Sequence, residues 1–123
     1  MKLISHQKVT MQHMNHHGSL EAEYLVSWMT NGAYMGVSQI RGRADQIVMC
    51  AISDVRFQNP VPLGAIMSIN YELVKTGKSS LTIAVEARDM INPELIYGSC
   101  QVVFVNTDEH GKSAPHGIVM PEA

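Results

Sequence analysis

The chain has 123 residues, of which 46% are hydrophobic and 16% charged, so it is long enough for one domain with its own hydrophobic core. The formal net charge of −2 argues against a general nucleic-acid-binding protein. No apolar run approaches the roughly 20 residues that span a bilayer and no signal peptide is evident, so we expect no membrane segment and a cytoplasmic location.

The first predicted elements are a strand over residues 2–11 and a helix from Ser19 to about Gln39. Apolar residues recur every three to four positions along the second segment, which is typical of an amphipathic helix. We expect Ser19 to cap this helix and the acidic residues at 21 and 23 to lie in its first turn, where the helix dipole favours them. Gly32 and Gly36 would keep one surface flat enough for a sheet or a partner backbone to approach. The large side chains expected in the core are Tyr24, Trp28, Met29 and Tyr34.

Four long strands are predicted after the helix, because the period of the apolar residues changes to two. The strands cover residues 46–57, 65–76, 80–90 and 96–107. Proline and glycine separate them, and Gly77 between two strands is typical of a hairpin. Residues from 111 onward should trail along the surface. Cys50 and Cys100 lie alone in strand-like stretches and are predicted to be buried thiols of a reducing compartment.

The order of these elements predicts the fold. One strand, one long apolar helix and then four antiparallel strands give a sheet with a single helix to cover one of its faces. Such a sheet should curl around the helix. We therefore predict an α+β hotdog fold, a long central helix wrapped by a curved antiparallel sheet of five or six strands, in a single domain over residues 1–123.

Four motifs in register resemble the cytosolic acyl-CoA hydrolases of the hotdog superfamily. They are residues 15–20 (NHHGSL), 55–61 (VRFQNPV), 74–80 (VKTGKSS) and 105–112 (VNTDEHGK). The resemblance covers nearly the whole chain and implies a thioester hydrolase that binds acyl-CoA at a subunit interface. The expected assembly is a homodimer at least, with tetramer and hexamer left open. The expected cofactor is none besides the coenzyme A of the substrate.

The resemblance also implies a site at the start of the helix. Backbone N–H groups there, those of Ala22 and Glu23 among them, would stabilise the oxyanion of the attacked thioester. Asn15 would hold the carbonyl or the attacking water, unless it only caps a turn. His13 or His17 would orient or protonate a group of the site, unless these imidazoles are simply exposed in a polar turn. The cluster of His13, His16 and His17 lacks the further ligands of a zinc site, so no metal is predicted.

The departures from the family pattern concern the catalytic acid. Thr30 stands where these hydrolases usually carry an acidic residue, and Asn15 stands where a second branch has an aspartate. Neither side chain can accept a proton from water near neutral pH. Three accounts remain open: Glu23 acts as the base of a thioesterase, it removes a proton beside the carbonyl in an acyl-CoA ammonia lyase or hydratase, or the site only binds and senses acyl-CoA. Residues 21 and 23 lie roughly 200° apart on a helix, so at most one of them faces the ligand.

Basic residues in the closing loops are the candidates for the phosphates of coenzyme A. Arg56 and Arg88 are secondary candidates. The predicted coenzyme A-binding residues are Lys75, Gly77, Lys78, Ser79, Ser80 and Lys112.

Overall fold

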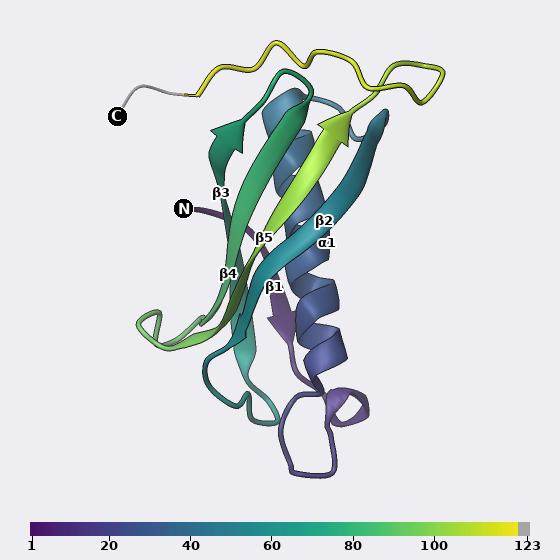
Figure 1. Cartoon of the computed structure of the whole chain (residues 1–123). Coiled ribbons are helices and arrows are strands. Elements are labelled where there is room, and N and C mark those ends of the chain that lie inside the picture. The colour runs from purple at the N-terminus through teal and green to yellow at the C-terminus, as the bar shows by residue number, and fades with distance from the viewer. Residues whose placement is uncertain (121–123) are drawn as a thin grey trace.

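The computed structural model describes residues 1–120 as one helix against a five-stranded antiparallel sheet (Figure 1). The elements are β1 (Lys2–Lys8), the 3-10 turn η1 (Met11–His13), α1 (Ala22–Arg41), β2 (Ile47–Phe57), β3 (Ile66–Thr76), β4 (Ser80–Asp89) and β5 (Ile96–Asn106). The strand order is β1-β3-β4-β5-β2, so β1 and β2 form the two edges of an open sheet. The predicted hotdog arrangement is confirmed. No helix within residues 1–120 is long and apolar enough to cross a membrane.

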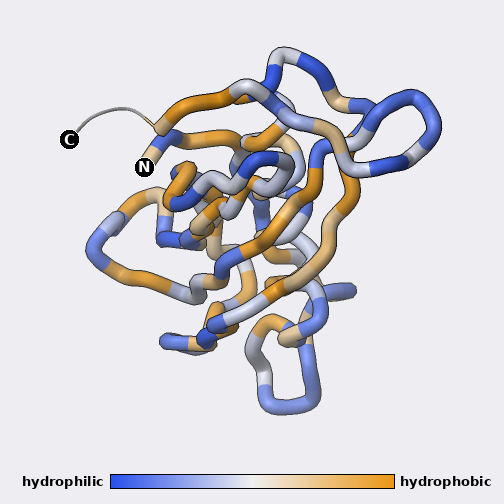
Figure 2. Tube along the Cα trace, turned by 45° about the horizontal axis from the view of Figure 1, so that its top comes forward, coloured by the Kyte–Doolittle hydropathy of each residue, from blue (hydrophilic) through white to orange (hydrophobic). Residues whose placement is uncertain are grey.

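The core lies between α1 and the concave face of the sheet. Alternate residues of β3, among them Met67, Ile69 and Tyr71, are buried under the helix, whereas Ser68 and Asn70 point away from it. Figure 2 shows hydrophobic stretches along the strands and mostly hydrophilic residues in the loops at the ends of the sheet. A hydrophobic cluster of this kind excludes water over most of the sheet and holds the helix in one orientation.

Two helix glycines allow the close approach of α1 and β3. A Cβ atom on Gly36 would lie 2.5 Å from the Tyr71 ring, and a Cβ atom on Gly32 would meet Cγ2 of Ile69. These distances leave no space for a methyl group, because carbon atoms pack at about 3.5–4.0 Å. The predicted flat helix surface therefore faces the sheet.

The helix starts later than predicted, at Ala22 rather than Ser19. Ser19 is not the cap, because its hydroxyl and amide bond to the side chain of Asn15, and Leu20 N–H donates to the carbonyl of Val61. Glu21 occupies the N-cap position without a side-chain capping bond. The first strand also ends early, at Lys8, and is followed by η1.

Two burial predictions are wrong. Cys50 is exposed because β2 is an edge strand that the helix does not cover, whereas Cys100 is buried as predicted. Tyr34 remains 37% exposed, and its hydroxyl donates to the carbonyl of Ala44 beyond the helix. Tyr24 and Trp28 are half-buried at the edge of the core, and Met29 is fully buried.

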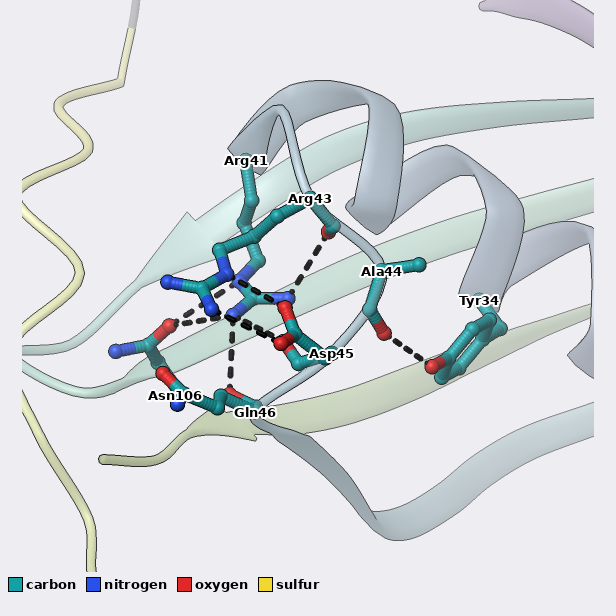
Figure 3. Close-up of polar contacts among 7 residues, drawn as sticks. All are labelled: Tyr34, Arg41, Arg43, Ala44, Asp45, Gln46 and Asn106. Atoms are coloured by element: carbon teal, nitrogen blue, oxygen red, sulfur yellow. Dashed lines mark hydrogen bonds and ion pairs between the residues drawn. The ribbon is translucent and has the colours of Figure 1, made fainter. Parts of the chain in front are cut away.

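Arg41 fastens the end of the helix to the start of β2 (Figure 3). Its guanidinium donates to the carbonyls of Asp45 (2.8 Å) and Gln46 (3.0 Å) and to Oδ1 of Asn106 at the end of β5 (2.9 Å). The planar fork of an arginine suits such a junction, because one group can reach several acceptors at once. Burial and the neighbouring Arg43 lower the pKa of Arg41 from its usual value. This junction fixes where β2 begins.

The chain after β5 crosses the end of the sheet, as predicted for a surface segment. Asn106 Nδ2 donates to the carbonyl of Ala114, and the amide and ring of His116 bond to the carbonyls of Lys78 and Ser80. Ile118 packs against the core. The segment therefore lies over the β3–β4 hairpin, at the end of the molecule where the helix finishes (Figure 1).

Candidate active site

A cavity of about 210 Å³ opens beside the N-terminal end of α1. One wall is the start of the helix and the other is the segment that follows β2. Its lining consists of Ser19, Leu20, Ala22, Leu25, Phe57, Gln58, Asn59, Pro60 and Val61. Small ligands bind in concave sites lined mostly by apolar side chains with a few polar groups, and this cavity has such a lining at a volume below that of most ligand pockets.

The helix tip at this cavity has free hydrogen-bonding capacity. The first N–H groups of an α-helix have no carbonyl partner within the helix. Glu21 provides no side-chain cap for them, and Ala22 lines the cavity. The partial positive charge of the helix N-terminus adds to the attraction for an anion. A developing negative charge on an oxygen atom would be stabilised at such a helix end, and the role of the Ala22 and Glu23 N–H groups in this stays a prediction.

The segment before the helix holds the tip in place. Glu21 N–H donates to the carbonyl of His13 (2.8 Å). The His13 ring is buried edge-on between Tyr24 and Trp28, with ring centroids 4.9 Å apart in each pair. Its Nδ1 accepts the Thr10 N–H at 3.1 Å. His13 thus connects β1, the turn and the helix, and it does not line the cavity.

Asn15 organises the turn that precedes the helix. Its Oδ1 accepts the N–H groups of His17 (2.9 Å) and Ser19 (3.2 Å). Its Nδ2 lies 3.2 Å from the hydroxyl of Ser19, which itself lines the cavity. The turn-capping function weighed for Asn15 is therefore present in the structure, and a contact with a ligand remains a prediction. His16 and His17 are exposed and lie against one another.

Glu23 and Thr30 share one side of the helix. They are seven residues apart, which is nearly two full turns, so their side chains leave the helix in similar directions about 10 Å apart. Glu23 is exposed in the first turn, and Thr30 donates its hydroxyl to the carbonyl of Ser27 (3.0 Å). Neither Glu21 nor Glu23 lines the cavity of the single chain, although both flank Ala22, which does. Which of them faces a ligand stays a prediction.

The basic candidates lie at the opposite end of the molecule. Lys75, Gly77, Lys78, Ser79 and Ser80 belong to the β3–β4 hairpin, and Lys112 to the loop after β5. The resemblance places these loops on one side, and they do share one end of the sheet (Figure 1). That end is the C-terminal end of α1, about 30 Å from the helix tip for a helix of 20 residues. One chain therefore does not bring the two groups together.

The secondary basic candidates are already paired. Arg56 Nη2 lies 3.1 Å from Asp54 Oδ1, and Arg88 Nη2 lies 2.6 Å from Glu86 Oε2. Arg88 is on the face of the sheet away from the helix. Within residues 1–120, no group of three or more His, Cys, Asp or Glu residues is arranged to hold a metal ion.

The edge strand β2 presents a long apolar surface. Every residue of β2 except Ile47 is exposed. The exposed apolar side chains are Val48 (50%), Met49 (37%), Ile52 (43%), Val55 (38%) and Phe57 (56%). A long apolar edge is a ready site for pairing with another strand, so monomeric proteins usually protect it. Phe57 ends this strand and also lines the cavity.

The segment from Phe57 to Val61 was matched as a motif but not predicted to form the site. It supplies five of the nine residues that line the cavity, and Asn59 is fixed there by the hydrogen bond from its Nδ2 to the carbonyl of Ile96 (2.7 Å). The sequence signal for this wall is the Asn59–Pro60 pair, which by itself predicts only a break between strands. A loop that stops next to the helix N-terminus cannot be located without the sheet order.

Comparisons with known proteins give one family and one fold. The sequence profile of the thioesterase superfamily matches residues 12–94. A hexameric thioesterase from Yersinia pestis aligns with a TM-score of 0.82 and 21% identity, covering 99% of this chain and 97% of that one. A hexameric hotdog fold thioesterase of Campylobacter jejuni aligns with a TM-score of 0.79 and 19% identity, covering 90% and 86%.

A variant of the acyl-CoA hydrolase from Staphylococcus aureus in complex with coenzyme A aligns with a TM-score of 0.84 and 24% identity, covering 97% of this chain and 72% of that one. No curated protein matches the sequence significantly.

Proposed function

Because this chain belongs to the thioesterase superfamily, we propose that it hydrolyses acyl-CoA thioesters at the N-terminal end of α1. The observation that carries the proposal is the uncapped first turn of the helix, with Ala22 opening onto a cavity. Similar folds belong to proteins described as acyl-CoA thioesterases and hydrolases, which supports the substrate class. The proposed location is the cytoplasm, and no cofactor is needed besides the coenzyme A of the substrate.

The helix tip supplies the oxyanion site of the proposed reaction. Water attacks the thioester carbonyl carbon, and the carbonyl oxygen becomes an anion that the N–H groups of Ala22 and Glu23 stabilise. Collapse of this intermediate breaks the carbon–sulfur bond. The products are the carboxylic acid and coenzyme A, whose thiolate takes up a proton.

Glu23 is the proposed general base. Its carboxylate is exposed at the first turn, next to the proposed oxyanion donors, and it can accept a proton from the attacking water. Asn15 and His17 are proposed to position the water or the carbonyl from the preceding turn. Thr30 is proposed to contact the ligand from the same side of the helix as Glu23, at the position where the resembling hydrolases usually carry an acid.

A second copy of the chain is proposed to complete the site by pairing β2 with β2. The edge is apolar and eleven residues long, and two copies related by a two-fold axis would pair antiparallel. Such an axis reverses the direction of the partner, so the hairpin end of one subunit approaches the helix tip of the other. The basic residues of the partner would then bind the phosphates of coenzyme A, which one chain cannot arrange across about 30 Å. The similar Yersinia and Campylobacter proteins are described as hexameric, so we propose a dimer as the minimum.

The catalytic proposal is tested by thiol release from acyl-CoA esters. Wild type should release coenzyme A. Glu23→Gln should lose at least about 100-fold in kcat, since general base catalysis contributes 10²–10⁴-fold. Glu21→Gln is the matched control and should keep most of the activity. A change in double-bond absorbance or ammonia exchange without thiol release would indicate a lyase instead, and binding without any reaction would indicate a sensor.

The dimer proposal is tested by a charge at the centre of β2. Ile52→Lys places an ammonium group in the proposed pairing and should give monomers by sedimentation, with loss of hydrolysis. Ile91→Lys is the matched control, because Ile91 is 80% exposed in the β4–β5 loop and is not part of the β2 edge. A monomeric wild type, or an Ile52→Lys protein that stays dimeric, would contradict the pairing.

A further inference from the structure

The cavity at the helix tip has a closed inner wall. Leu25 and Val61 line it and are almost fully buried, with 4% and 2% of their surfaces exposed. One helical turn further on, Met29 is completely buried. A ligand that enters at Ala22 and follows the helix inward therefore meets the side chain of Leu25.

Leu25 lies directly on the sheet, so no gap remains behind it. A Cβ atom added to Gly98 of β5 would lie 3.0 Å from Cδ2 of Leu25, which is closer than ordinary carbon contacts. Gly98 thus permits Leu25 to sit against the backbone of β5. An acyl chain can pass between helix and sheet at this point only if the leucine side chain is removed.

The inner wall at Leu25 and Val61 is buried within one chain, so a second subunit at β2 leaves this limit on the depth of the cavity in place. About 210 Å³ corresponds to about seven water-sized groups, at roughly 30 Å³ for each. A carbonyl with a short aliphatic chain is of this size, whereas a fatty acyl chain would have to extend past Leu25 or out of the cavity. The lining is mostly apolar, which favours an unsubstituted chain over a charged one.

We propose that Leu25 determines the chain length of the substrate, and that the protein acts on short-chain acyl-CoA esters of up to about six acyl carbons. This inference rests on the proposed function, since it takes the helix tip as the position of the thioester carbonyl. Leu25 acts through shape alone and is a specificity-determining residue. Leu25→Ala removes three carbon atoms from the wall, so the preferred acyl chain should lengthen by about two to three carbons.

The experiment measures kcat/KM and the dissociation constant for straight-chain acyl-CoA esters from two to sixteen carbons. Wild type should prefer acyl chains of two to six carbons. Its kcat/KM should be at least tenfold lower for the eight-carbon ester, since one methylene changes discrimination by about 10–200-fold. Leu25→Ala should shift both profiles toward eight carbons. Leu25→Val is the milder variant, with a shift of about one carbon, in case the alanine variant folds poorly.

Leu81→Ala is the matched control for a lost core leucine. Leu81 is fully buried at the hairpin end of β4, away from the cavity, so this variant should be destabilised without a change of profile. A wild-type preference for long chains, or the same profile in Leu25→Ala and wild type, would overturn the inference. If no ester is hydrolysed but affinities still follow chain length and shift in Leu25→Ala, the inference stands and the proposed hydrolysis fails.

Discussion

Replacing Gly36 by alanine should have two opposing effects on the free energy of unfolding. Alanine should stabilise the helix by about 1 kcal/mol relative to glycine. The new methyl group, however, would lie 2.5 Å from both Cγ and Cδ2 of Tyr71 and 3.1 Å from its Cβ. These atoms lie at the base of a side chain that is 97% buried, so the ring cannot rotate away and the helix must move by about 1 Å.

The steric effect should therefore exceed the gain in helix propensity. Overpacking of a core costs about 1–3 kcal/mol, and a contact with the base of a ring belongs near the upper value. The expected net loss for Gly36→Ala is about 2 kcal/mol, or a Tm about 8 °C lower for a domain of this size. Urea and thermal unfolding followed by circular dichroism would measure it, at one protomer concentration for all variants because an oligomer's stability depends on concentration.

Two further variants test the cause. Asn31→Ala changes an exposed position of the same helix and should be neutral or slightly stabilising. In a Tyr71→Leu background the ring is absent, so Gly36→Ala should cost less than in wild type, which a double-mutant cycle would show. A Gly36→Ala protein as stable as wild type would refute the reasoning.

Three other expectations concern the junction after the helix, the acid stability and the buried thiol. Arg41→Lys should lose about 2 kcal/mol in urea unfolding, because the single nitrogen atom of an ammonium group cannot span the four acceptors that the arginine fork reaches. Arg43→Lys, in an exposed ion pair, should lose less than about 0.5 kcal/mol. Equal losses would contradict the role of the fork. Hydrogen bonds from a tyrosine hydroxyl and two backbone N–H groups lower the pKa of Asp89 in the folded protein. The ionised carboxylate therefore stabilises the fold fully above the unfolded pKa of about 3.9, and this contribution is lost as the pH falls through the lower folded pKa. The difference in unfolding free energy between wild type and Asp89→Asn should therefore shrink between pH 7 and pH 3, and a constant difference would exclude this ionisation as the cause. Burial raises the pKa of Cys100 to about 11, so in a Cys50→Ser background a thiol reagent at pH 8 should react only after unfolding.

The four strands after the helix could be predicted from the sequence to within one residue at each end, because segments rich in apolar residues are separated there by glycine, proline and asparagine, whereas β1 ends three residues before its predicted end. The helix start could not. Ser19 has the chemistry of a cap, but its partner is Asn15, four residues earlier in a turn that no periodicity describes. Cys50 was misplaced for a related reason: an apolar stretch predicts burial, and only the sheet order identifies β2 as an uncovered edge.

The candidate site was predicted in part. The helix tip followed from resemblance and from the general properties of helix ends. The wall from Phe57 to Val61 was not predicted, since its position depends on β2 ending beside the helix start. Sequence order likewise does not give the distance between Glu23 and Lys78, which is set by the length of the helix and the direction of the strands.

The separation of the helix tip from the basic hairpin has a consequence for mixed assemblies. We consider a dimer in which each site takes its helix tip from one subunit and its phosphate-binding lysines from the other. If one chain carries a substitution in the tip and the other carries a substitution in the lysines, both substitutions fall in the same site and the second site is intact. A dimer of one Glu23→Gln chain and one Lys78→Ala chain would hold one site with both defects and one with neither. Two inactive preparations, unfolded and refolded together in equal amounts, would then recover about a quarter of the wild-type rate, because half of the dimers are mixed and half of their sites are intact.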